Sequence, residues 1–99
     1  EHPIVTAPST PGWQTDATGA KVWPVNNYLL EVTRVTDWIT KGVVKQHRTV
    51  SSYVNSLLDH GLHLVRLVEW GPTQEQVAEQ PDLADEVHRP YFLLVAAQA

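Results

Sequence analysis

The sequence predicts an α/β fold, and three segments in its second half carry that prediction. Residues 50–60 place apolar side chains at helical spacing and are followed by Gly61, a residue type that commonly ends a helix. Residues 62–70 (LHLVRLVEW) and 91–97 (YFLLVAA) are short apolar runs of the kind that form interior strands. We therefore expect one amphipathic helix to pack on two strands.

The helix over residues 50–60 has one apolar face. Its positions i, i+3, i+4, i+7 and i+8 are Val50, Tyr53, Val54, Leu57 and Leu58. Gly61 then stands where the chain usually enters the left-handed conformation, which glycine adopts without steric cost. The pattern predicts that the helix ends just before this glycine.

Both strands are predicted to be covered on their two faces. In the first strand the apolar residues occupy both sides, with Leu62, Leu64 and Val68 on one and Val65 and Leu67 on the other. Residues 91–97 are apolar without alternation, which is typical of an interior strand. Between the strands, Thr73 can cap a short helix over 74–80, and Pro81 ends that helix or begins another.

The first 24 residues predict little regular structure, because prolines and glycines interrupt them repeatedly. Ile4-Val5 are expected to close a strand that begins earlier. The rest is expected to be a loop, with Trp13 and Trp23 anchoring it.

Residues 25–48 are richer in β-branched side chains and predict short strands. The strands are expected over 33–39 and 43–47, with Lys41-Gly42 as the turn between them. Residues 25–31 fit either a strand or one face of a short helix, and the pattern leaves both open.

Composition excludes several classes of function. The 99 residues contain no Cys, so disulfides, Cys-based metal sites and Cys nucleophiles are excluded. No apolar run approaches the roughly 20 residues that cross a bilayer, and no signal peptide is visible, so we expect a cytoplasmic protein without a membrane partner. Residues 21–48 carry five basic residues against two acidic ones, a surplus too small to predict nucleic-acid binding.

The order of motifs resembles the C-terminal portion of a class I S-adenosylmethionine-dependent methyltransferase. Glu1-His2-Pro3 looks like the end of the fifth strand of that family, and residues 28–48, ending in His-Arg, look like its substrate-side insertion. The helix with its terminal Gly-Leu and the run RPYFLL, which begins at Arg89, look like the last helix and the last strand.

The resemblance implies a Rossmann-like α/β fold, of which this chain is the last helix and the final two strands as an antiparallel pair, preceded by a β-rich insertion. Residues 1–46 would be the end of a central strand and the acceptor-side lid. Residues 47–99 would be the helix–strand–helix–strand segment, and the two together form one incomplete domain.

The resemblance also implies methylation of a small-molecule acceptor, with S-adenosylmethionine as the cofactor of the parent enzyme. The glycine-rich loop that cradles the cofactor is absent, since the five glycines form no G-x-G motif. We therefore assign no cofactor-binding and no catalytic residue here. The isolated chain is expected neither to bind the cofactor nor to turn over.

Six residues are substrate-binding candidates. By the resemblance, His2 lies at the carboxyl end of a central strand, where ligands gather in α/β sheets, and His47 and Arg48 lie at the mouth of the acceptor pocket. Trp23, Tyr28 and Trp38 could line that pocket, since such pockets are largely apolar and aromatic.

Each of these candidates also has a structural interpretation. His2 could cap a strand end, and Arg48 could pair with an acid while His47 packs at the helix start. The aromatic residues could anchor a segment with little other core.

Two other constellations do not predict a site. His60 and His63 have no obvious third ligand and are expected on different elements, so no metal site is predicted. The serines of the helix lack a G-x-S-x-G elbow, so a hydrolase triad is not predicted either.

One consequence concerns partners. In the full fold the last strand lies between the fifth and sixth, so without the fifth strand residues 91–97 present an apolar edge, and we expect self-association through it.

The alternative to the enzyme is a stand-alone, non-enzymatic domain whose aromatic residues 13–38 hold a small ligand or a protein partner.

Overall fold

The computed structural model describes residues 1–10, 12–36 and 42–99. They form two compact units, one of Glu1–His2 with Val50–Ala99 and the other of Pro3–Thr49. Within these described residues, every helix is too short or too polar to cross a membrane.

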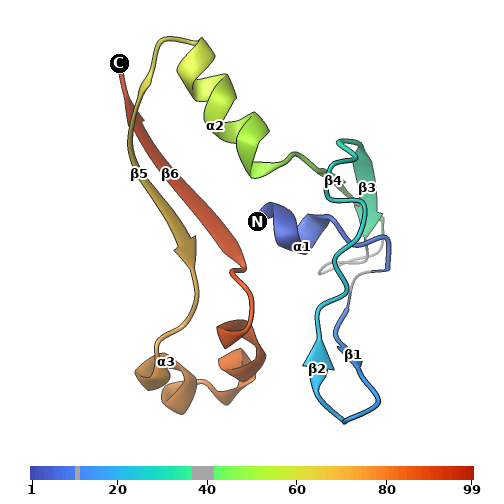
Figure 1. Ribbon diagram of the computed structural model, residues 1–99. Coiled ribbons are helices and arrows are strands. Elements are labelled where there is room, and N and C mark those ends of the chain that lie inside the picture. Colours follow the sequence, from blue (N-terminus) through green and yellow to red (C-terminus); the bar gives the residue numbers. More distant parts are fainter. Residues whose placement is uncertain (11, 37–41) are drawn as a thin grey trace. The chain divides into compact units, whose positions relative to one another are not determined.

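The first unit contains the predicted helix, α2 (Val50–Asp59) (Figure 1). Gly61 has a φ of 80° and ends the helix, as predicted. Its N–H donates to the carbonyl of Leu58 and the N–H of Leu62 donates to the carbonyl of Leu57, each over 3.1 Å. This pair of bonds is the Schellman motif, which satisfies carbonyls that the end of the helix leaves without an intrahelical partner.

The two predicted strands are present as β5 (His63–Trp70) and β6 (Phe92–Gln98), which pair antiparallel. Figure 1 shows them as a long two-stranded ribbon. The register places Leu67 opposite Val95 and Trp70 opposite Phe92, with an irregularity between Leu64 and Arg66. The α/β prediction and the antiparallel final pair are confirmed.

The prediction that these strands are covered on both faces is wrong for this chain. Val65 is 59% exposed and Leu94 is 52% exposed. Among the described residues, the buried apolar side chains are those of Pro3, Val5, Ala7 and Pro8, none of them in β5 or β6. The reason is that β5 and β6 form a two-stranded ribbon, on which α2 packs against β5.

The connection between β5 and β6 agrees with the prediction made from the sequence. Thr73 caps α3 (Gln74–Glu79) with a capping box, in which its hydroxyl accepts from the N–H of Gln76 over 3.2 Å and its N–H donates to the Gln76 side chain over 2.8 Å. Pro81 then begins a 3₁₀ helix, η1 (Pro81–Val87).

The second unit contains two antiparallel hairpins. β3 (Thr33–Thr36) pairs with β4 (Val43–Gln46), with Val35 opposite Val44. Gly42 enters β4 at a φ of 75°, which suits the predicted turn. The remaining residues of the predicted strand, 37–39, and Lys41 of the turn lie outside the described residues.

The second hairpin was not predicted. β1 (Gln14–Thr15) pairs with β2 (Lys21–Val22), where a loop was expected. Asp16 organises the turn, because its side chain accepts hydrogen bonds from the N–H groups of Thr18, over 2.8 Å, and Ala20, over 3.1 Å. An Asp that begins a turn, with a Gly three residues later, is the signal that could have predicted this hairpin.

The expected strand at Ile4-Val5 is wrong, since these residues lie in the short helix α1 (Pro3–Thr6). Pro3 begins the helix, and the N–H of Ala7 donates to its carbonyl over 3.0 Å. Proline suits the first turn of a helix, because its fixed φ is helical and its missing N–H has no partner there. Residues 25–31 contain neither helix nor strand.

Candidate functional site

His47 is the most completely enclosed of the candidate residues, with 0% exposure. It follows β4, and its N–H donates to the carbonyl of Val32 over 3.0 Å. Its ring Nε2 lies 2.7 Å from the carbonyl oxygen of Tyr28, and its Nδ1 lies 2.6 Å from the hydroxyl of Thr6. Both ring nitrogens are therefore engaged within the second unit.

The partners of His47 determine which nitrogen carries the proton. A carbonyl oxygen only accepts, so Nε2 must be the donor to Tyr28. In the neutral ring Nδ1 then accepts the hydroxyl proton of Thr6, whose second contact, with the carbonyl of Pro3, is longer at 3.4 Å. His47 thereby ties α1, the segment at Tyr28 and the end of β4 together.

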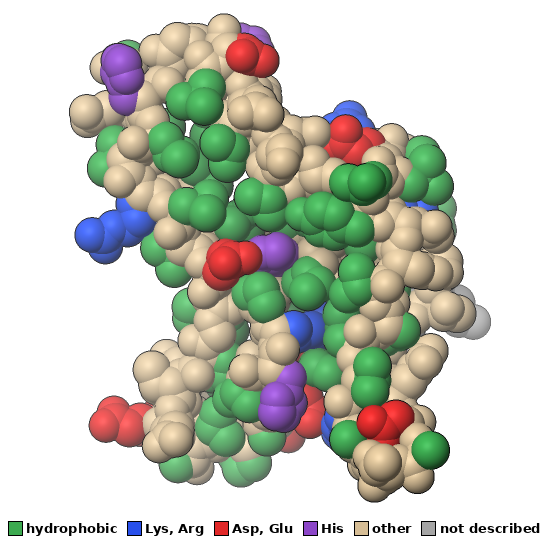
Figure 2. Space-filling model, in the orientation of Figure 1, with side chains coloured by type: hydrophobic (Ala, Val, Ile, Leu, Met, Phe, Trp, Pro, Cys, Tyr) green, Lys and Arg blue, Asp and Glu red, His purple; other side chains and the backbone are tan. Residues whose placement is uncertain are grey.

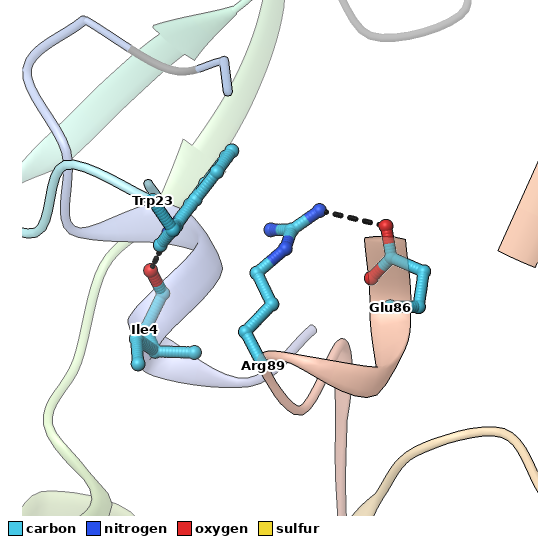
Figure 3. A network of polar contacts seen from close by, with 4 residues as sticks. All are labelled: Ile4, Trp23, Glu86 and Arg89. Atoms are coloured by element: carbon cyan, nitrogen blue, oxygen red, sulfur yellow. Dashed lines mark hydrogen bonds and ion pairs between the residues drawn. The ribbon is translucent and has the colours of Figure 1, made fainter. Parts of the chain in front are cut away.

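Tyr28 and Trp23 take part in the same unit. The ring of Tyr28 packs edge-on against His47, with 5.8 Å between ring centroids. The indole N–H of Trp23 donates to the carbonyl of Ile4 over 2.6 Å (Figure 3), and its ring meets that of Trp13 edge-on at 5.4 Å. The two tryptophans flank the β1–β2 hairpin, where the sequence predicted them to anchor a loop.

Arg48 and Trp38 do not join this cluster in the described structure. Arg48 is exposed, and no hydrogen bond or ion pair joins it to another described residue. Trp38 lies outside the described residues.

His2 lies in the first unit and is 5% exposed. Its Nε2 is 2.7 Å from a carboxylate oxygen of Glu69, near the end of β5. Its backbone N–H donates to the carbonyl of Tyr91 over 2.8 Å, which fixes the residue at the start of β6. The sequence analysis missed Glu69, although an acid in the apolar run LVEW was a signal for it.

Further titratable groups gather at this end of the β5–β6 ribbon. The guanidinium of Arg89 lies 5.2 Å from the centre of the Tyr91 ring and 3.0 Å from a carboxylate oxygen of Glu86, the contact drawn in Figure 3. Burial, followed by the charge of Glu1, raises the pKa of the Tyr91 phenol. The phenol is therefore held in its neutral, hydrogen-bonding form.

The His2–Glu69 pair is suited to contact a polar ligand. The carboxylate of Glu69 is within hydrogen-bond distance of the imidazole of His2 and orients the ring. The oriented ring can therefore hold a polar group of a ligand.

The glycines of the chain lie in open surroundings. At Gly12, Gly19, Gly42 and Gly61 an added Cβ would meet nothing within 4 Å, so none of these glycines lies in a tight cradle. Within the described part of the chain, no group of three or more His, Asp or Glu side chains converges on a metal position.

Solved structures that are similar to this chain include two methyltransferase structures. An S-adenosylmethionine-dependent methyltransferase from Mesorhizobium loti is 48% identical, with a TM-score of 0.93 over 100% of this chain and 45% of that one. A protein from Listeria monocytogenes, provisionally assigned as an S-adenosylmethionine-dependent methyltransferase, is 38% identical, with a TM-score of 0.83 over 99% of this chain and 44% of that one.

This chain therefore spans less than half the length of either solved structure. No protein-family profile and no curated protein matches it.

Proposed function

The chain belongs to the S-adenosylmethionine-dependent methyltransferases, as the counterpart of their C-terminal portion, and on this premise we propose that it forms the substrate-side part of an enzyme that methylates a small molecule. One observation carries the proposal, which is the 48% identity and TM-score of 0.93 along the entire chain. Chains this similar in sequence and backbone share a common origin, although fold alone would not imply function.

Five of the candidate residues are proposed to contact the acceptor. His2, oriented by Glu69 at 2.7 Å, is the proposed polar contact. Trp23, Tyr28 and Trp38 are proposed to supply apolar and aromatic surface, with Arg48 at the mouth of the site. His47 donates a hydrogen bond to the carbonyl of Tyr28. Its proposed role is therefore to position Tyr28 and not to contact the acceptor.

The isolated 99-residue chain is proposed neither to bind S-adenosylmethionine nor to turn over, because it supplies no glycine-rich loop for the cofactor. Isothermal titration calorimetry of the chain with S-adenosylmethionine tests this directly. We expect no heat of binding up to about 1 mM cofactor, a concentration at which sites weaker than about −4 kcal/mol stay unfilled. A micromolar dissociation constant would overturn this part of the proposal.

The enzyme itself is tested on the product of the complete reading frame. Its intact mass and its release of S-adenosylhomocysteine with a panel of small hydroxyl, amine and carbon acceptors are the two readouts. We expect a product of about 25–30 kDa, the size of one large α/β domain, with activity on at least one acceptor class.

A native product of 11.1 kDa without activity would instead favour a stand-alone binding domain. In that case the aromatic residues of the second unit become the site to probe by ligand screening.

A further inference from the structure

A series of contacts joins η1 to His2 within the first unit. Just after η1, the guanidinium of Arg89 donates from Nη2 to a carboxylate oxygen of Glu86 over 3.0 Å (Figure 3). The same guanidinium lies over the ring of Tyr91, 5.2 Å from its centre. The carbonyl of Tyr91 accepts the N–H of His2 over 2.8 Å. The series therefore ends on the residue proposed to contact the acceptor.

The backbone that carries Arg89 and Tyr91 is stiff. Pro90 stands between them, and its ring fixes its own φ and restricts the backbone of Arg89 to extended conformations. A guanidinium over an aromatic ring is attracted by the negative face of that ring. The segment therefore holds Tyr91 just before β6 begins at Phe92, with its carbonyl presented to His2.

The burial of the Glu86–Arg89 pair favours a role in geometry over a role in stability. The side chain of Arg89 is 6% exposed and that of Glu86 is 17% exposed. Two charges removed from water lose about as much solvation free energy as their attraction returns, so a buried ion pair adds little net stability. The first unit does not lack apolar side chains that could replace such a pair, since Figure 2 shows them at the surface over α2 and the β5–β6 ribbon.

We propose that Arg89 is a positioning residue, which holds Tyr91 and thereby fixes the backbone of His2 and the place of its imidazole. This inference rests on the proposed function, since it assigns a role to a further residue of the same site. Glu69 orients the ring of His2 from β5, and Arg89 acts through Tyr91 on its backbone from the start of β6. The two together determine where the imidazole meets the acceptor.

Steady-state kinetics of the complete enzyme tests the proposal. We expect Arg89→Gln to raise the KM for the acceptor about threefold to tenfold with kcat nearly unchanged, because a binding contact is weakened. A variant that is only destabilised would instead lose active protein, which lowers kcat and leaves the KM. Arg66→Gln changes an exposed arginine of β5 and is the matched control, with wild-type constants. Arg89→Lys keeps the charge but not the planar group, and its KM should lie between those of the wild type and Arg89→Gln.

A double-mutant cycle tests whether Arg89 acts through His2. In the His2→Gln enzyme, Arg89→Gln should raise the acceptor KM by less than about twofold, because the contact that it positions is already lost. Two effects that multiply in the double variant would overturn the inference.

Hydrogen exchange measured by nuclear magnetic resonance gives a readout that does not depend on activity. The N–H of His2 donates to Tyr91, so its exchange rate reports how often this bond opens. We expect Arg89→Gln to speed this exchange about tenfold. The N–H of Leu62, which donates to the carbonyl of Leu57 at the end of α2, should keep its wild-type rate. An unchanged rate at His2, or an equal rise at both amides, would overturn the inference.

Failure of the proposed function gives a different result. If the complete enzyme methylates none of the acceptors, or if His2→Gln leaves the acceptor KM at its wild-type value, the proposed acceptor contact is wrong. The exchange rate at His2 then still decides whether Arg89 positions this residue.

Discussion

At the scale of single residues, two histidines have their rings held by different kinds of partner. His47 has 0% exposure and binds a carbonyl and a hydroxyl, whereas His2 binds the carboxylate of Glu69, whose side chain is 56% exposed. A ring held by neutral groups in the interior serves structure. A ring held by a carboxylate near solvent is suited to polar contacts with a ligand.

Replacing His47 tests its structural role. His47→Ala leaves the hydroxyl of Thr6 and the carbonyl of Tyr28 without their partner and creates a cavity, so we expect a loss of about 2–4 kcal/mol of unfolding free energy. Urea denaturation followed by tryptophan fluorescence measures it. The neighbouring Arg48→Ala, at an exposed position, is the control and should change stability by less than about 0.5 kcal/mol. Equal effects of the two variants would refute the role of His47.

Replacing His2 tests the acceptor contact in the complete enzyme. Loss of one hydrogen bond costs about 1.4 kcal/mol, so we expect His2→Gln to raise the KM for the acceptor about tenfold, and Glu69→Gln, which loosens the ring, to raise it by less. His63→Gln changes an exposed histidine at the start of β5 and should leave the KM unchanged. A His2→Gln enzyme with the wild-type KM would remove His2 from the site.

At the scale of elements, turn and cap residues account for most boundaries. Gly61 ends α2, Thr73 begins α3 and Asp16 organises the β1–β2 hairpin. The hydrogen bonds at each boundary join residues that are at most five positions apart in the chain. Such boundaries can therefore be tested by changing one residue at a time.

The cap of α2 is tested at Gly61. An alanine there must adopt a φ of 80° while its Cβ meets nothing within 4 Å, so the cost is conformational alone, and we expect Gly61→Ala to destabilise the protein by about 1 kcal/mol. Gly71→Ala is the matched control, because its Cβ would make an ordinary contact, at 3.7 Å, with the carbonyl of Glu86. Thermal unfolding of both variants distinguishes them, and equal midpoints would contradict the cap.

The hairpin turn is tested through the acidity of Asp16. Hydrogen bonds from the side chain and then the backbone of Thr18 lower the pKa of this carboxyl. Because the pKa of this carboxyl is lower in the folded than in the unfolded state, its ionised form stabilises the fold at pH values above the unfolded-state pKa of about 3.9. This stabilisation is lost as the pH falls through the folded-state pKa. A titration by nuclear magnetic resonance should give a midpoint below about 3.9, and Thr18→Val should raise it. A midpoint at or above that value would contradict the turn geometry.

At the scale of the whole molecule, the two units have little interior of their own. The buried apolar side chains of the described residues are those of Pro3, Val5, Ala7 and Pro8, while the apolar residues of β5 and β6 are half-buried or exposed. Hydrophobic burial is the main favourable contribution to folding. Such a chain is suited to complete its core against further polypeptide.

This sparse interior predicts low stability. We expect the 99-residue chain to unfold in urea with a free energy below about 5 kcal/mol, the lower end of the usual range. A free energy of about 10 kcal/mol would contradict this expectation.

Local sequence patterns were enough to predict α2, β5, β6 and the cap of α3, because apolar periodicity and cap chemistry act over a few neighbouring residues. The β1–β2 hairpin could also have been predicted from the sequence, because Asp16 and Gly19 are typical turn residues. The burial of the strands could not be predicted, since an apolar run shows which side chains can be buried and not what covers them.

The partners of the candidate site residues could be identified only from the folded chain. The sequence singled out His2 and His47, but Glu69 lies 67 positions from His2 and Thr6 lies 41 positions from His47. Sequence patterns are local, whereas such contacts exist only once the chain has folded, so residue types predicted the candidates and the fold chose the groups that orient them.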